Sequence, residues 1–236
     1  ELLGGCGNKD TNKDNTTTDT AEESKPQAPD KNQELPAATY MGGNNTITEV
    51  CRELDLAGAS NVDTFKEWVT DFADSAGKNA NLKDTWSDAD KMKADTGKCM
   101  DGWEEKHDYS DADCRMTAFL LLDGLLHAQS TEDSYNGTYL MFDMEAIDNV
   151  DRYEIIRQNK DMFTTLYGEK SITDDKHPET TFSDNWKKYG FQIDSDRISL
   201  LSIAIYDPDL DAIFVGHTGL LIKCSDYYLF VEKIAF

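Results

Sequence analysis

Cys114, His217 and Glu232 are residue types that together can perform thiol chemistry. A cysteine nucleophile needs an accessible, stabilised thiolate, a histidine within hydrogen-bond reach and a third group that orients the imidazole. Cys114 stands at the predicted start of the most apolar helix in the chain, in the segment Asp-Cys-Arg-Met-Thr-Ala-Phe. The unsatisfied N–H groups and the dipole of a helix N-terminus lower the pKa of a cysteine, so this position suits an activated thiol.

The other two residues lie on a predicted hairpin near the end of the sequence. His217 opens the run His-Thr-Gly-Leu-Leu-Ile, in which it shares a strand face with Gly219, and Glu232 lies on the returning strand. With a turn near Ser225, position 217 pairs with position 232 or 233, so we expect Glu232 to contact the imidazole. In this hypothesis Cys114 attacks a carbonyl carbon, His217 takes the thiol proton, and N–H groups at the helix start stabilise the oxyanion.

Each of the three residues also has an ordinary structural interpretation. Cys114 can be a buried core cysteine, His217 a hydrogen-bonded structural histidine and Glu232 a solvated strand residue. Asp111 and Asp113 lie beside Cys114, and anions raise the pKa of a thiol unless they are paired, for which Arg115 is available. The sequence leaves both interpretations open.

The elements that would position these residues form an α+β arrangement, with N-terminal helices packed on a C-terminal antiparallel sheet. Helical patterns dominate from Thr46 to about residue 190, and β-rich runs follow Phe191. Strands are predicted over 198–206, 212–222 and 228–234. One helix is predicted over 62–76, ended by Gly77, and a weaker one over 85–94, closed by Gly97. A third helix is capped by Asp111 or Asp113 and reaches Leu126. A fourth runs from Asp148 or Asp151 to Tyr167 and is ended by Gly168.

The first residues of the chain resemble a lipobox. Residues 2–6 read Leu-Leu-Gly-Gly-Cys, and the resemblance implies that a diacylglyceryl group is attached to Cys6 after a signal peptidase cuts before it. We therefore interpret residues 1–6 as the remnant of a lipoprotein signal peptide. Residues 7–39 are polar and acidic with almost no large apolar side chain, which predicts a disordered tether. Residues 40–236 are then a single domain, and its apolar last strand suggests a clipped C-terminus.

Composition excludes several classes of function. The chain has 46 acidic and 23 basic residues, a formal net charge of -23, which makes nucleic-acid binding improbable. No apolar stretch is long enough to span a bilayer. Cysteines 51, 99 and 224 form no C-x-x-C pattern, and the alternating Asp207, Asp209 and Asp211 lack the glycine and glutamate of a calcium loop. We expect no metal or cofactor, and the pairing of the cysteines in disulfides stays open.

Two family resemblances rest on the same motifs. The segments Gly-His-Thr-Gly-Leu-Leu-Ile, Leu-Phe-Val-Glu-Lys-Ile-Ala-Phe and Asp-Cys-Arg-Met-Thr-Ala-Phe are similar to the domain-of-unknown-function 4300 family of Gram-positive lipoproteins, over most of residues 40–236. The order of a cysteine opening a helix, a histidine starting a strand and a polar residue on the next strand resembles the NlpC/P60 papain-like superfamily. That resemblance implies a papain-like fold, with Cys114 as nucleophile, His217 as general base and Glu232 as orienting residue.

Two functions are consistent with these observations. The first is a surface lipoprotein, anchored through Cys6 on the extracellular face of a bacterial cell membrane, that acts as a cysteine peptidase or amidase on a peptide or peptidoglycan substrate. The second is a non-catalytic lipoprotein with the same anchor that binds a ligand or partner. The distance between the Cys114 sulfur and the His217 ring discriminates between them.

Overall fold

The computed structural model describes residues 39–40, 44–82, 85–88, 93–132, 134–172 and 178–233. These residues all belong to the compact unit that spans Ala37–Phe236. The predicted lipobox with Cys6, nearly all of the predicted tether, and residues 234–236 lie outside the described residues.

The chain is a mixed α+β structure in which most helices precede the main strands, as predicted. The helices are α1 (Asn44–Ala57), α2 (Val62–Ala76), α3 (Thr96–Glu104), α4 (Cys114–Leu121), α5 (Met141–Asn149), α6 (Glu154–Gln158), α7 (Lys160–Tyr167) and α8 (Pro178–Tyr189), with short 3-10 helices at η1 (Gly77–Ala80) and η3 (Asp151–Tyr153). The strands are β1 (Thr39–Tyr40), β2 (Ser87–Asp88), β3 (Leu126–His127), β4 (Lys170–Ser171), β5 (Gln192–Ile193), β6 (Ile198–Asp207), β7 (Ala212–Lys223) and β8 (Tyr228–Val231).

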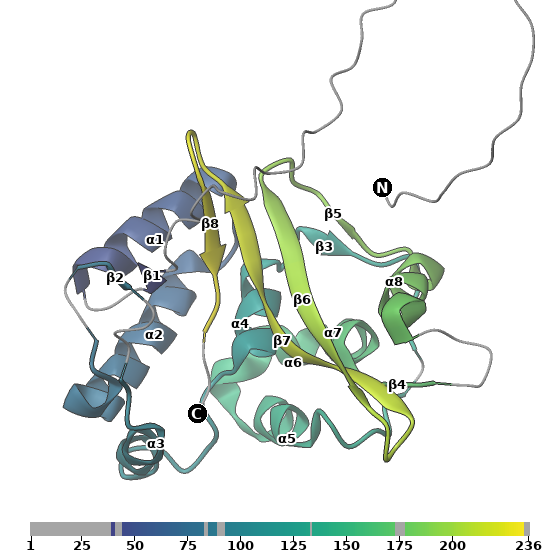
Figure 1. The fold of residues 1–236 in the computed structure, drawn as a ribbon, viewed down its shortest axis with the longest axis horizontal. Coiled ribbons are helices and arrows are strands. Elements are labelled where there is room, and N and C mark those ends of the chain that lie inside the picture. Colours follow the sequence, from purple (N-terminus) through teal and green to yellow (C-terminus); the bar gives the residue numbers. More distant parts are fainter. Residues whose placement is uncertain are drawn as a thin grey trace, which may run out of the picture. The chain divides into compact units, whose positions relative to one another are not determined.

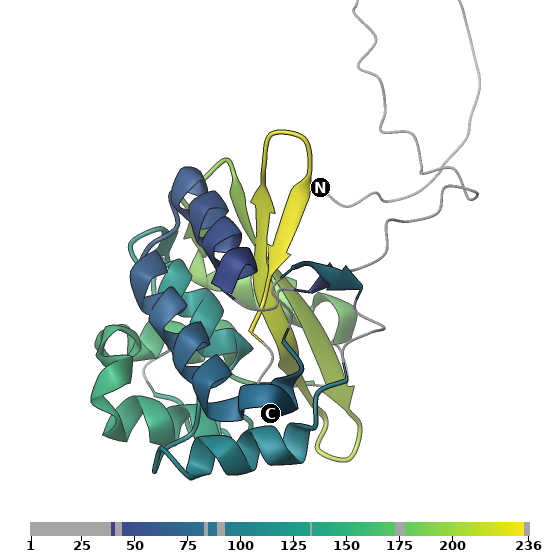
Figure 2. The same cartoon turned by 90° about the vertical axis from the view of Figure 1, so that its left-hand side faces the viewer.

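Most helices lie on one side of the sheet formed by the last three strands. Figure 1 shows β6, β7 and β8 in front of α4, α6 and α7, and Figure 2, turned by 90°, shows most of the helices gathered on one side of the same strands. α4 packs directly against β7. We call the side that α4 contacts the inner face and the opposite side the outer face.

β7 is the central strand of an antiparallel sheet with the order β4–β7–β6, and β8 also pairs with β7. Its register with β6 runs from Ile198 opposite Ile222 to Asp207 opposite Ala212. Ile203 pairs with His217 whereas Ala204 pairs with Val215, so Gly216 is an extra residue in β7. Such an unpaired residue is a β-bulge, after which the side chains of a strand resume their alternation shifted by one position.

α4 is the central helix of the hydrophobic core. Seven of its eight residues are buried, and only Arg115 is not. The Phe119 ring meets Phe163 of α7 edge-on at 5.3 Å between centroids, and Trp68 of α2 meets Tyr153 in the same way at 5.2 Å. Edge-to-face contacts of this kind add to the free energy gained by burying the rings. No helix within the described ranges has the length and apolar character needed to cross a membrane.

Several predicted elements are confirmed. α2 covers Val62–Ala76 and ends at Gly77, whose φ of 54° suits a residue without a side chain. The expected strands over 198–206 and 212–222 match β6 and β7 within one residue at each end. The last expected strand is shorter than predicted, since β8 ends at Val231.

Other predictions were wrong in position. The expected helix over 85–94 does not begin at Thr85, because Ser87–Asp88 pair with β1 as strand β2. The helix of this region is α3, which begins after the cap Asp95 and contains Gly97 in its first turn. The helix expected to reach Leu126 ends at Leu121, before a turn in which Gly124 has φ 73°. The region from Asp151 to Tyr167 is helical but is interrupted at Asn159, and α5 precedes it unpredicted.

Candidate functional site

Cys114 is the first residue of α4, as predicted. Asp113 caps the helix, since its Oδ1 accepts the Met116 N–H at 2.9 Å. The thiol is not at a surface, however, because only 7% of Cys114 is exposed. Its sulfur faces β7, where it meets the backbone N–H of Thr218.

This environment disfavours a thiolate. Burial, together with the smaller effect of the neighbouring charge of Asp113, raises the pKa of Cys114 to about 11. The Thr218 N–H and the Arg115 guanidinium act in the opposite direction but are weaker. The thiol at this helix start is therefore neutral at physiological pH, because desolvation outweighs the field of the helix N-terminus.

Arg115 holds two carboxylates beside the thiol. Its Nη2 lies 2.6 Å from Asp113 Oδ2 and 2.9 Å from Asp143 Oδ2, and its Nη1 donates to the Val215 carbonyl at 3.1 Å. Arg115 thus pairs with Asp113, one of the two aspartates beside Cys114. Asp143, from α5, is only 5% exposed, and burial together with the Asp113 charge holds its pKa well above its usual range despite Arg115. Sequence reasoning missed Asp143, because it lies in a helix with no strong local pattern.

His217 and Glu232 are in contact, as predicted. His217 Nε2 bonds Glu232 Oε2, and each side chain is about one-third exposed, at 32% and 31%. The register differs from the expected one: Leu220 pairs with Val231, so continuing the ladder would place Glu232 beside Gly219. Glu232 therefore reaches His217 diagonally across the strands, a contact that long side chains can make.

The structure does not bring Cys114 and His217 together. After the bulge, Thr218 and Leu220 of β7 are buried on the inner face, where Thr218 meets the thiol. His217 has the opposite parity and pairs with Ile203, whose side chain is 60% exposed. Neighbouring strand residues point to opposite faces, so the imidazole lies on the outer face and the thiol beneath the inner one. Among the described residues no hydrogen bond joins the two groups.

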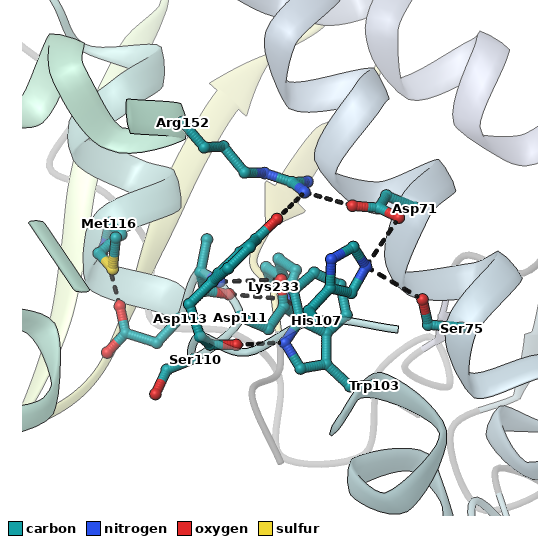
Figure 3. Close-up of polar contacts among 12 residues, drawn as sticks. Asp71, Ser75, Trp103, His107, Ser110, Asp111, Asp113, Met116, Arg152 and Lys233 are labelled. Carbon is teal, nitrogen blue, oxygen red and sulfur yellow. Dashed lines mark hydrogen bonds and ion pairs between the residues drawn. The ribbon is translucent and has the colours of Figure 1, made fainter. Parts of the chain in front are cut away.

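A second polar cluster, which sequence reasoning missed, lies between α2, α3 and η3. Figure 3 shows Arg152 and His107 directed at Asp71 of α2. His107 Nε2 lies 3.2 Å from Asp71 Oδ1 and 3.5 Å from Ser75 Oγ. A Ser–His–Asp triad uses both ring nitrogens, one for each partner, whereas the same nitrogen faces both partners here. The cluster is therefore a structural network and not a nucleophile site.

Lys233 anchors the segment after β8 to the start of α4. Its ammonium group bonds Asp111 and donates to the Ala112 carbonyl at 2.7 Å, and Figure 3 shows it directed at Asp111. Lys233 is only 6% exposed. Burial raises the pKa of Asp111, and Lys233 opposes that shift. Asp111 is thus paired with a cation.

The four described cysteines, Cys51, Cys99, Cys114 and Cys224, are all buried and free. Within the described ranges, no group of histidine, cysteine and carboxylate side chains has the arrangement needed to hold a metal ion.

Comparison with known proteins places the chain in a family without assigning an activity. A family model matches residues 39–236, which begins where β1 begins. No curated protein and no solved structure matches the chain. The chain belongs to the family described as Domain of unknown function (DUF4300).

Proposed function

We propose that this chain is a surface lipoprotein of the bacterial cell envelope that binds a partner and is not an enzyme. Cys6 carries the lipid, residues 7–38 hold the domain away from the membrane, and the domain binds through the outer face of its sheet. The lipobox motif supports the anchor, because two or more acyl chains give stable membrane attachment. An extracellular partner fits that location.

The observation that carries the binding function is the exposure of apolar side chains on the outer face. Leu201 and Ile203 of β6 are 50% and 60% exposed, and Phe230 of β8 is 39% exposed. The register places Leu201 opposite Gly219, and the Phe230 ring would contact any Cβ added to Gly219, so these side chains lie together across the sheet. Soluble monomers rarely expose contiguous apolar surface of this kind, and where they do it usually marks an interaction site.

The alternative is a papain-like cysteine hydrolase acting on a peptide or peptidoglycan. One observation favours it: the contact between His217 and Glu232, which is the base and orienting pair that the hydrolase requires. Its nucleophile is the weak point, because Cys114 is neutral, buried and on the opposite side of β7. The binding function needs no such rearrangement.

Two experiments test the proposal on the full chain, expressed with an export signal in a Gram-positive host. The first is metabolic labelling with a fatty acid. We expect Cys6→Ala to lose the label and leave the membrane fraction, while the matched control Asn8→Ala keeps both. A labelled, membrane-bound Cys6→Ala variant would overturn the anchor.

The second experiment measures whether the outer face is covered on cells. Cysteine is introduced at Ile203, or as control at Leu56 of α1, which is 61% exposed. A membrane-impermeant maleimide then labels the purified protein and intact cells. We expect the Ile203→Cys variant to react several-fold more slowly on cells than when purified, relative to Leu56→Cys. Equal ratios at both positions would show that nothing binds the outer face.

A further inference from the structure

β6 is an unpaired edge of the sheet. It pairs with β7 on one side, and no described strand pairs with its other side. Figure 1 shows β6 as the outermost strand of the three, running from β5 at one end to the β6–β7 hairpin at the other. An antiparallel strand directs the N–H and C=O groups of alternate residues away from its partner, so β6 presents a row of main-chain groups that no strand in the described part of the chain pairs with.

This edge lacks the usual protection against pairing. Natural edge strands carry lysine, proline or an inward charge that prevents another strand from adding. Residues 198–206 read Ile-Ser-Leu-Leu-Ser-Ile-Ala-Ile-Tyr, with no charge and no proline. The one charged residue of β6 is its last, Asp207, which accepts a hydrogen bond from the Tyr139 hydroxyl. Leu201, Ile203 and Ile205 are 50%, 60% and 46% exposed at alternate positions. An added strand could hydrogen-bond to the main chain of β6 and pack its own alternate side chains against this apolar row.

A cavity lies at the start of β6. It has a volume of about 330 Å³ and is lined by Ile198, Ser199 and Leu200 of β6 together with Trp186 of α8 and Phe191, which precedes β5. An added strand that continued past Leu200 would reach this cavity with a side chain. Recognition by strand addition typically combines main-chain hydrogen bonds for affinity with such recesses for specificity.

Acidic residues lie at both ends of the uncharged edge. Asp194 and Asp196 precede β6 and are exposed, and Asp209 and Asp211 follow it and are exposed too. Arg197, between Asp196 and β6, donates to the Lys223 and Leu56 carbonyls, and His127 lies 3.4 Å from Asp194, so the aspartates leave an acidic excess at this end. An apolar partner with basic residues at its two ends would place opposite charges beside these aspartates. Opposite charges across neighbouring strands stabilise a pair.

The same charges disfavour a second copy of this chain. If two β6 strands paired antiparallel about their centres, Asp196 of one copy would lie near Asp209 of the other, and Asp194 near Asp211. Like charges opposite one another destabilise a strand pair, and each chain carries a net charge of -23 in addition.

We propose that β6 binds an extended polypeptide segment that adds to the sheet as a further strand, apolar at alternate positions and flanked by lysine or arginine. The inference rests on the proposed function, since it names the partner of the binding domain. The partner pairs with the free edge of β6, places one side chain in the cavity beside Trp186, and sets its basic ends against Asp194, Asp196, Asp209 and Asp211.

The test uses the purified full chain and three fluorescent peptides of alternating valine and threonine. One has two lysines at each end, one has two glutamates at each end, and one is the lysine peptide with N-methyl groups on alternate residues. Fluorescence anisotropy measures binding. We expect the lysine peptide to bind and the other two to bind at least about tenfold more weakly, because each loses cross-strand charge pairs or main-chain hydrogen bonds.

Matched variants and amide hydrogen exchange locate the site. Asp194→Asn combined with Asp209→Asn weakens lysine-peptide binding several-fold, whereas Asp101→Asn on α3 leaves it unchanged. The lysine peptide protects the amides of residues 199–206 and not those of α1. Equal affinity for the N-methylated peptide, or no protection in β6, would overturn strand addition. Protection of the same amides without peptide, in a dimer detected by sedimentation, would overturn it in favour of self-pairing.

The failure of this inference and the failure of the proposed function are distinguishable. Protection of Ile203→Cys on cells without peptide binding at β6 would leave a binding protein whose partner covers the face by another mode. If the peptide binds at β6 but Ile203→Cys is not protected from the maleimide on cells, the strand-addition inference holds. The proposal that a partner covers the outer face in the envelope is then refuted.

Discussion

The reactivity of Cys114 tests the central argument about the site most directly. With a pKa of about 11, the thiolate fraction at pH 7.4 is roughly 300-fold smaller than that of an ordinary cysteine of pKa about 8.5. Only the thiolate reacts with iodoacetamide, and a thiolate of higher pKa is about tenfold more nucleophilic, so alkylation of Cys114 is expected to be roughly 30-fold slower than alkylation of an ordinary free thiol. Burial of the side chain slows it further.

The variants separate the causes of this low reactivity. Asp113→Asn removes the neighbouring charge but keeps a residue that caps helices, so it should raise the alkylation rate by about tenfold while α4 stays intact. His217→Ala should leave both the rate and its dependence on pH unchanged, since the imidazole lies on the other face of β7.

The assay follows the alkylation rate of Cys114 between pH 6 and 10 by mass spectrometry of its peptide. Peptides carrying the other buried cysteines report any general unfolding. A titration midpoint near or below 8.5 that moves upward in His217→Ala would refute the reasoning and restore the activated thiol.

Three further perturbations test the packing around the site by urea unfolding. Lys233→Ala leaves Asp111, whose side chain is 13% exposed, without its cation. We expect this change to cost about 3 kcal/mol, and Asp111→Asn in the same chain to recover part of the loss. A loss below about 1 kcal/mol would contradict the assigned ion pair. Folding raises the pKa of Asp143, so the free energy of unfolding of the wild type falls as the pH rises from the ordinary carboxyl pKa toward the raised one. Asp143→Asn cannot titrate and lacks this fall. We therefore expect the stability of Asp143→Asn relative to the wild type to increase between about pH 4.5 and 8, and a decrease would contradict the raised pKa. Deletion of Gly216 removes only the bulge and should cost no more than about 2 kcal/mol. Deletion of Leu221 instead moves the side chains of the preceding β7 residues to the opposite face of the sheet and should unfold it. Equal effects of the two deletions would refute the assigned register.

Elements with a strong local pattern were predictable from the sequence. α2 has apolar residues at helical spacing and a glycine stop, and the hairpin of β7 and β8 has β-rich runs on either side of a turn. Within the site, these local signals located Cys114 at a helix start and brought Glu232 to His217. Both conclusions depend on short-range geometry alone.

Features that depend on distant parts of the chain were not predictable. Ser87–Asp88 became a strand because it pairs with β1, which lies far earlier in the chain. The burial of the Cys114 thiol depends on β7 packing over α4, and Asp143 reaches Arg115 from a separate helix. A helix N-terminus lowers the pKa of a thiol only where solvent or a nearby cation stabilises the thiolate. Whether either is present depends on the tertiary structure and not on the local sequence.

The separation of Cys114 from His217 follows from one extra residue in β7. Val215 is buried against the helices, and strict alternation from it would bring His217 to the same inner face. Gly216 has no partner on β6, so the alternation restarts after it, and Thr218 takes the inner position that meets the thiol. An isolated glycine inside a strand pattern is the sequence signal of such a bulge. The bulge keeps the apolar residues on both sides of it facing the helices, and the outward position of the imidazole is a consequence of that requirement.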